Sequence, residues 1–151
     1  MNDIENKLRD SLFTANGSAA RSGGSTPIGI LYKDLSYAIN GAAIQVHKAL
    51  GPGQLESTYE RALSKELAYR GIAHRCQVPI TSWYRGDAVG DFVVDMIVED
   101  QVLLELKSVV KVAPVHRSQV LSYLRATGLK LGLLINFHEP VVWRAIKRIV
   151  L

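Results

Sequence analysis

The chain has 151 residues, 48% of them hydrophobic, which suits one globular domain with a sizeable core. Its only cysteine, Cys76, excludes an intrachain disulfide and a thiolate-rich zinc site within the chain, which fits a reducing compartment. The net charge is a modest +4, and with neither an apolar run of about 20 residues nor a signal peptide we expect a soluble cytoplasmic protein without a membrane partner.

Residues 1–29 are predicted to form a flexible N-terminal tail, because the second half of this segment is rich in Gly, Ser, Ala and Thr. The globular domain then covers residues 30–151. Its first helix is predicted to begin with Asp34 as the N-cap and to run to Leu50, with apolar residues at helical spacing. Glycine and proline at residues 51–53 end this helix.

The rest of the domain changes between helical and strand patterns. Pro114 suits the first position of a helix that Gly128 ends, and β-branched and aliphatic runs predict strands. In chain order we predict a helix at 55–70 ended by Gly71, strands at 74–84, 91–98 and 102–109, a helix at 114–127, and strands at 130–137 and 141–150. This order, α-α-β-β-β-α-β-β, predicts an α/β fold with a mixed β-sheet flanked by helices.

The predicted hairpin at residues 92–108 holds three charged residues within otherwise apolar strands. If residues 99–101 form a three-residue loop, Asp95 lies directly opposite Glu105. Lys107 is two residues further along and projects from the same face as Glu105. Two carboxylates and an ammonium group are therefore predicted to converge on one patch of the sheet.

Carboxylates that lie opposite each other repel, and a divalent cation between them reverses the sign of that interaction. Oxygen ligands suit Mg²⁺ or Mn²⁺, which also bind substrate phosphate. Lys107 could then orient or deprotonate the attacking water while the cation stabilises the developing charge. On spacing alone an alternative stays open, in which Lys107 forms a cross-strand ion pair with Glu105 or Asp95.

An ordered set of motifs extends this pattern along the chain. The set consists of Gly53, Glu56 and Tyr59 in G-x-x-E-x-x-Y, then Asp95, then E-L-K at residues 105–107, then LINF at residues 134–137. From about residue 31 to residue 151 the chain resembles the GxxExxY protein family of the PD-(D/E)XK nuclease superfamily. The resemblance implies the restriction-endonuclease-like core of that superfamily.

The same resemblance implies a role for each matching residue. Asp95 and Glu105 would be metal ligands, the Leu106 carbonyl a further ligand, and Lys107 the catalytic lysine. Glu56 matches the glutamate that the first-motif helix brings towards the metal. We therefore expect a site for Mg²⁺ or Mn²⁺.

The helix at 114–127 carries a second match. Gln119 and Tyr123 are four residues apart, and His116 lies one turn earlier, so the three form a polar stripe. The Q-x-x-x-Y pattern resembles a motif of RecB-type exonucleases in the superfamily, where it lines the active site. The alternative is that these are ordinary, half-exposed helix residues.

Eight basic residues and one acidic residue lie between Lys107 and Arg148. This stretch, which includes Lys111 and Arg117, predicts either a surface for a phosphate backbone or a solvated basic surface. Trp83 and Trp143 could stack on bases, although half-buried packing is favoured for both.

Together these patterns predict a metal-dependent nuclease, exonuclease-like or directed at single strands, with DNA favoured over RNA. Two alternatives are a catalytically silent module of the same fold that binds nucleic acid or a protein partner, and a nuclease acting on RNA. The oligomeric state is left open, with a homodimer as one option.

Overall fold

The computed structural model describes residues 30–151, and the predicted tail at residues 1–29 lies outside the described residues. The predicted order of helices and strands is confirmed. The elements are α2 (Lys33–Leu50), α3 (Glu56–Tyr69), β1 (His74–Tyr84), β2 (Asp87–Val98), β3 (Val102–Lys107), α4 (Pro114–Thr127), β4 (Leu131–Asn136), the 3₁₀-helix η1 (Val142–Ala145) and β5 (Ile146–Val150).

The five strands form one mixed sheet in the order β1-β2-β3-β4-β5. Strands β3 and β4 are parallel, because α4 crosses over between them, and the other neighbours are antiparallel. The α/β fold class predicted from the sequence is therefore confirmed.

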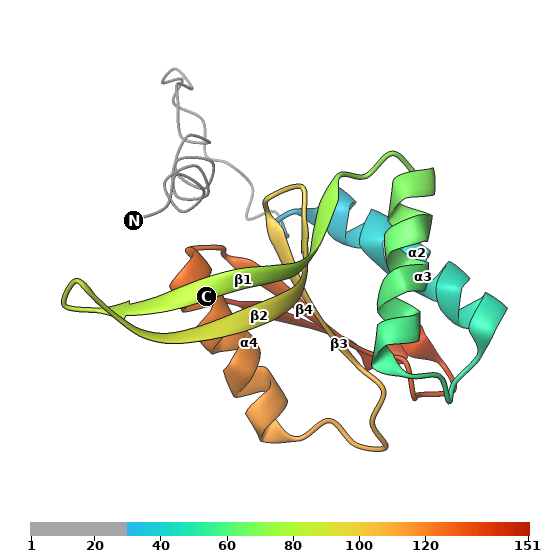
Figure 1. The fold of residues 1–151 in the computed structure, drawn as a ribbon. Coiled ribbons are helices and arrows are strands. Elements are labelled where there is room, and N and C mark those ends of the chain that lie inside the picture. Colours follow the sequence, from blue (N-terminus) through green and yellow to red (C-terminus); the bar gives the residue numbers. More distant parts are fainter. Residues whose placement is uncertain (1–29) are drawn as a thin grey trace. The chain divides into compact units, whose positions relative to one another are not determined.

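Different helices cover the two faces of the sheet (Figure 1). On one face, α2 and α3 bury residues such as Ile39 and Leu63 against a set of strand residues that includes Leu104 and Leu133. On the other face, α4 packs against a second cluster that includes Leu134. Burial on both faces explains why β4 is apolar along almost its whole length.

Several boundaries differ from the prediction: β2 begins at Asp87 rather than at residue 91, β3 ends at Lys107 rather than at residue 109, and β4 is one residue shorter at each end. Helix α2 begins at Lys33, and the N-cap is Tyr32, with a φ of 50°, rather than Asp34. The side chain of Arg148 donates hydrogen bonds to Ser36 Oγ and to the Leu31 carbonyl, and these contacts fix the start of the helix from β5. A contact between residues so distant in sequence leaves no local signal.

The predicted strand at 141–150 is wrong in its first half. The 3₁₀-helix η1 occupies Val142–Ala145, and its first and last residues are both buried. Strand pairing with β4 begins only at Ile146. The expectation of half-buried tryptophans is also wrong, since Trp83 and Trp143 are 58% and 57% exposed. Within residues 30–151 the helices are too short or too polar to cross a membrane.

Candidate active site

Strands β2 and β3 separate at the point where the predicted acidic cluster begins. Strand β2 pairs with β1 almost to its first residue, but it pairs with β3 only from Met96↔Leu104 to Val98↔Val102. Asp95 is the first residue of β2 beyond this short ladder. The separation leaves space for side chains between two strands that would otherwise be bonded to each other.

The β1–β2 hairpin also bends at Asp95. Val94 packs in the cluster under α4, whereas Met96, two residues later, packs under α2 and α3. Residues two apart in a regular strand share a face, so the strand must turn over between them. Opposite Asp95, Gln77 falls between the pairs Cys76↔Met96 and Val78↔Val94 and has a left-handed φ of 51°. A non-glycine residue in this conformation stores strain beside the cluster.

The bend aims the Asp95 carboxylate at the backbone of β3. Asp95 Oδ2 accepts a hydrogen bond of 2.7 Å from the Leu106 N–H. The predicted register is right for Val98 opposite Val102, but the ladder stops before Asp95 could pair with Glu105, and Asp95 contacts the next residue instead. Within a strand the N–H and C=O of one residue face the same neighbour, so the Leu106 carbonyl also faces the gap beside Asp95.

Glu105 and Lys107 lie on the α4 side of β3. They alternate with Leu104 and Leu106, whose side chains pack under α2 and α3. The Glu105 side chain is buried, with 3% of the residue exposed, and its Oε1 lies 2.8 Å from Lys107 Nζ. The alternative left open by the sequence was a cross-strand ion pair of Lys107, and the observed pair with Glu105 forms within β3 instead. Asp95 and Glu105 each use one oxygen in these contacts, and their second oxygens make no hydrogen bond within residues 30–151.

Burial and mutual repulsion disfavour the charged carboxylates. Burial raises the pKa of Asp95 above its ordinary value, and the Glu56 charge raises it further. The hydrogen bond from the Leu106 N–H and the Lys107 charge lower this pKa by a smaller amount. Burial likewise raises the pKa of Glu105, and the charges of Asp95 and Glu56 raise it further. The hydrogen bond and the charge of Lys107 lower this pKa by a smaller amount. Three acidic groups are thus close enough to repel one another.

Lys107 is affected in the opposite sense. Burial alone would lower its pKa, but the hydrogen bond to Glu105 and the charges of Glu105, Glu56 and Asp95 outweigh burial and raise the pKa. In this state Lys107 is therefore an ammonium group at neutral pH, a hydrogen-bond donor and not a base.

The loop before α3 explains the G-x-x-E-x-x-Y pattern. Gly53 has a φ of 100°, a conformation that glycine adopts at low cost. The Tyr59 hydroxyl donates to the Gly51 carbonyl at 2.6 Å and accepts from the Gln54 N–H at 3.1 Å. These bonds fold the loop back on the first turn of α3, so that Glu56, its first residue, is exposed on the side where its charge reaches Asp95.

Two further contacts, which the sequence did not predict, fix the chain just after Lys107. Ser108 Oγ donates to the Gln54 carbonyl at 2.8 Å and so ties β3 to the loop before α3. The fully buried Asn136 accepts from the Val109 N–H and donates to its carbonyl. An asparagine inside the apolar run LINF was the available signal, because a buried amide needs partners.

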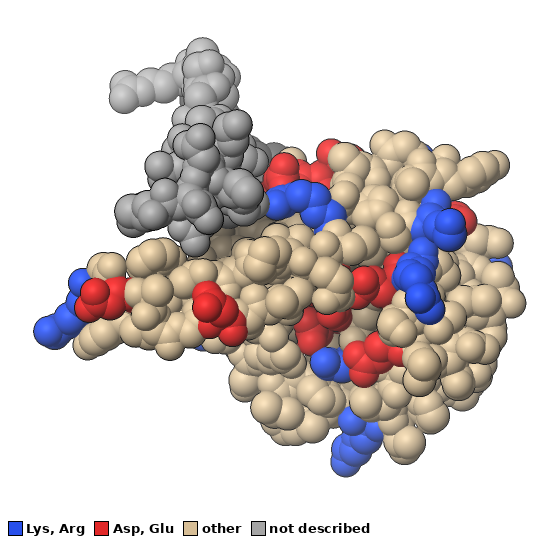
Figure 2. All heavy atoms as spheres, in the orientation of Figure 1, with Lys and Arg blue, Asp and Glu red and all other residues tan. Residues whose placement is uncertain are grey.

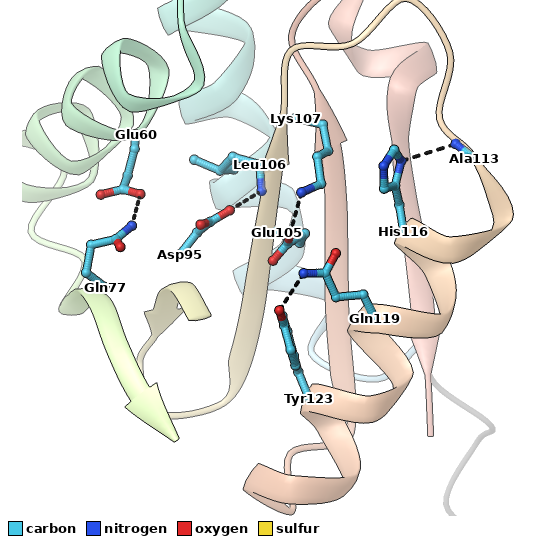
Figure 3. A network of polar contacts seen from close by, with 10 residues as sticks. All are labelled: Glu60, Gln77, Asp95, Glu105, Leu106, Lys107, Ala113, His116, Gln119 and Tyr123. Atoms are coloured by element: carbon cyan, nitrogen blue, oxygen red, sulfur yellow. Dashed lines mark hydrogen bonds and ion pairs between the residues drawn. The ribbon is translucent and has the colours of Figure 1, made fainter. Parts of the chain in front are cut away.

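Glu60 is a fourth carboxylate near the cluster, and no motif in the sequence selects it. It lies one turn after Glu56 and accepts a hydrogen bond from the Gln77 side chain. Burial raises the pKa of Glu60, and the Asp95 charge contributes to the rise. Figure 3 shows these groups in a row that runs from Glu60 and Gln77, past Asp95, to the pair of Glu105 and Lys107.

Helix α4 closes the row on its other side. Gln119 donates a hydrogen bond to the Tyr123 hydroxyl, and both side chains face β3 beside Glu105 (Figure 3). The Tyr123 ring stacks on Phe92 of β2 with centroids 4.3 Å apart. His116 Nδ1 instead accepts from the Ala113 N–H at 3.1 Å and so caps its own helix.

The basic residues between Lys111 and Arg148 contribute less to the candidate site than the sequence indicated. Lys111 and Arg117 are exposed, and within residues 30–151 neither forms an ion pair or hydrogen bond with the cluster. Arg148 has a structural role at the start of α2. Figure 2 shows acidic side chains gathered around a basic one between the regions of α3 and α4, with further basic side chains beside them over α3.

The donor set fits a divalent cation that retains water ligands. The carboxylates of Asp95 and Glu105 and the Leu106 carbonyl are all oxygen donors, and Mg²⁺ in particular needs only one or two carboxylates besides water and phosphate. No three His, Cys, Asp or Glu side chains within the described residues form a group that could hold a metal without such help. The chain's own contribution is thus a pair of carboxylates and a carbonyl.

The comparison with protein families agrees with this geometry. A family model described as the PD-(D/E)XK nuclease superfamily matches residues 33–149. The match covers most of the chain, so the protein belongs to this superfamily. No curated protein and no solved structure matches the chain.

Proposed function

We propose that the protein is a metal-dependent nuclease that hydrolyses phosphodiester bonds of DNA, as a member of the GxxExxY group within its superfamily. One observation carries the proposal: Asp95 and Glu105 are brought together, largely buried, where β2 and β3 separate. A purely structural cluster would gain nothing from carboxylates whose burial and repulsion raise both pKa values.

Each residue has a task in this proposal. Asp95, Glu105 and the Leu106 carbonyl would hold Mg²⁺ or Mn²⁺, with Glu56 as a further carboxylate. The bound cation supplies Lewis-acid stabilisation of charge on the phosphoryl group. The Lys107 ammonium orients the attacking water through Nζ, and Gln119 and Tyr123 contact the substrate beside it.

The test compares labelled single-stranded DNA, double-stranded DNA and RNA, each incubated with Mg²⁺ or Mn²⁺ and then with EDTA. We expect cation-dependent cleavage, strongest on DNA, that Asp95→Asn lowers by several powers of ten. Asp34→Asn is the matched control, because Asp34 is an exposed carboxylate of α2 that belongs neither to the cluster nor to the β1–β2 hairpin. It should cleave like the parent.

Cleavage of RNA alone would move the substrate from DNA to RNA. Absence of cleavage on all three nucleic acids, with binding retained, would support a catalytically silent binding module. Equal activity of Asp95→Asn and the parent would contradict the assignment of the site.

A further inference from the structure

The β1–β2 hairpin continues far beyond the site and ends in exposed aromatic side chains. Its pairing runs to Tyr84↔Asp87, with Arg85 and Gly86 forming the turn at positive φ. Figure 1 shows this end projecting past the rest of the sheet. Trp83 and Tyr84, just before the turn, are 58% and 63% exposed. Large rings at the tip of an arm contribute nothing to the core.

One face of this hairpin is anchored and the other is free. Phe92 stacks on Tyr123 and Val94 lies in the α4 cluster, so this face is fixed to the helix that lines the site. Val89 and Val93 alternate with those residues and are 61% and 48% exposed on the opposite face. An extra β2 residue shifts the register between Ser82 and Trp83, so the alternation at the tip follows β1. Trp83 therefore shares this free face with Thr81, whose partner is Asp91, whereas Tyr84 points to the opposite face at the tip. The free face thus begins at Trp83 and ends two residues before Asp95.

The arm, which is the part of the β1–β2 hairpin between residues 79 and 93, has charges that favour contact with bases over contact with phosphates. Between residues 79 and 93 the charged residues are Arg85, Asp87 and Asp91, so the arm has no positive stripe. Figure 2 shows few charged side chains along it. The Arg85 guanidinium lies 5.5 Å from the Tyr84 ring centroid, an arrangement that presents a flat cationic and aromatic surface. Aromatic rings with arginine stack on unpaired bases with little sequence preference.

We propose that the tip and free face of the β1–β2 hairpin bind the unpaired bases of a single-stranded nucleic acid, through stacking on Trp83 of the free face and on Tyr84 at the tip, and lead the strand to Asp95. This inference rests on the proposed nuclease function and specifies its substrate as single-stranded. Eight residues of β2 separate the tip from Asp95, which is roughly 26 Å, or about eight stacked nucleotides.

The experiment measures binding of labelled oligonucleotides by fluorescence anisotropy in EDTA, so that cleavage plays no part. For a single strand of about 16 nucleotides, Trp83→Ala with Tyr84→Ala should raise the Kd at least about fivefold, and up to about a hundredfold. A strand of about 4 nucleotides cannot span site and tip, so the parent should bind it much more weakly than the long strand. The salt dependence should stay the same in the tip variant, because no phosphate contact is lost.

Tyr37→Ala with Tyr69→Ala is the matched control, since these helix tyrosines are 81% and 88% exposed. The control should bind like the parent. In Trp143→Phe protein, where Trp83 is the remaining tryptophan, the long strand should quench the fluorescence. Thermal melting of each variant verifies that the fold is intact, as expected for exposed positions.

An unchanged Kd in the tip variant, or an equal loss in the control, would overturn the inference. So would a tip variant that changes from dimer to monomer without a change in Kd, since a second copy of the chain would then be the partner. The two proposals fail separately: cleavage with an unchanged Kd contradicts only the hairpin inference, and hairpin-dependent binding without any cleavage contradicts only the nuclease.

Discussion

The two edges of strand β3 are built differently. Its edge with β4 is paired along all six residues, and every β4 residue is buried. Its edge with β2 is paired at three positions and then opens around Asp95, Glu105 and Lys107, whose pKa values are all shifted. The difference indicates that one edge provides stability, whereas the other holds a buried charged cluster at a cost in stability. Changes on the two edges should therefore have separable effects.

The largest expected effect lies on the β4 edge. Leu133 is fully buried in the cluster under α2 and α3. Leu133→Ala leaves a cavity there and should lower the free energy of unfolding by about 2–5 kcal/mol. Urea denaturation with and without Mg²⁺ measures this loss. The loss should be the same in both conditions, and a loss that Mg²⁺ restores would contradict the separation of the two edges.

A second change on the same edge tests its close packing. A Cβ at Gly132 would lie 2.5 Å from Val120 Cγ1 of α4, too close for a stiff β-branched side chain to avoid. Gly132→Ala should therefore cost about 1–3 kcal/mol. The double change with Val120→Ala should cost less than the two single losses together, because it removes the clash. Additive losses in urea denaturation would show that the strand shifts instead.

A smaller effect tests the strain on the β2 edge. Gln77→Ala and Gln77→Gly both remove the hydrogen bond to Glu60, so the difference between them reports the backbone alone. With φ at 51°, the glycine variant should be more stable by about 1 kcal/mol. At Thr81, a regular position of the same strand, alanine should be the more stable by about 0.5–1 kcal/mol. If alanine were the more stable replacement at both positions, backbone strain at Gln77 would be contradicted.

The smallest expected effect is a dependence on pH in EDTA. The folded-state pKa values of Asp95 and Glu105 are raised above 3.8 and 4.5, so the folded state binds protons more tightly than the unfolded state. This contribution to stability is full below those values and is lost as the pH rises through the raised ones. The stability of the parent relative to Asp95→Asn should therefore fall as the pH rises from about 4 to 7. If urea denaturation gave a stability difference between the parent and Asp95→Asn that stays constant with pH, the raised pKa values would be contradicted.

The sequence predicted the elements well where local chemistry decides them. Pro114 and Gly128 bound α4, and the loop at residues 99–101 sets Val98 opposite Val102. Periodicity and turn residues act over a few positions, so a single sequence carries the signal. Asp95 and Glu105 were selected in the same way, because charges within apolar strands stand out, and their role in a metal site stays a prediction.

The features that depend on distant contacts were not predictable. The bend at Gln77 has no signal in the residue type, since glutamine is not selected for positive φ. It is fixed by packing on two different helices and by the bond to Glu60 of α3. Likewise, the hydrogen bond from the Leu106 N–H to Asp95 exists only because β2 and β3 separate there.

The response of the folded protein to Mg²⁺ and Mn²⁺ tests most directly whether this edge of β3 is a cation site. Thermal unfolding is measured for the parent, Asp95→Asn and the control Asp34→Asn, with EDTA and with each cation. A cation at ten times its Kd should stabilise the parent and the control by about 1.4 kcal/mol and Asp95→Asn much less, while Asp95→Asn in EDTA should be at least as stable as the parent. If Asp95→Asn instead lost several kcal/mol in EDTA and kept the full response to the cations, Asp95 would be a structural residue and the account of this edge would be wrong.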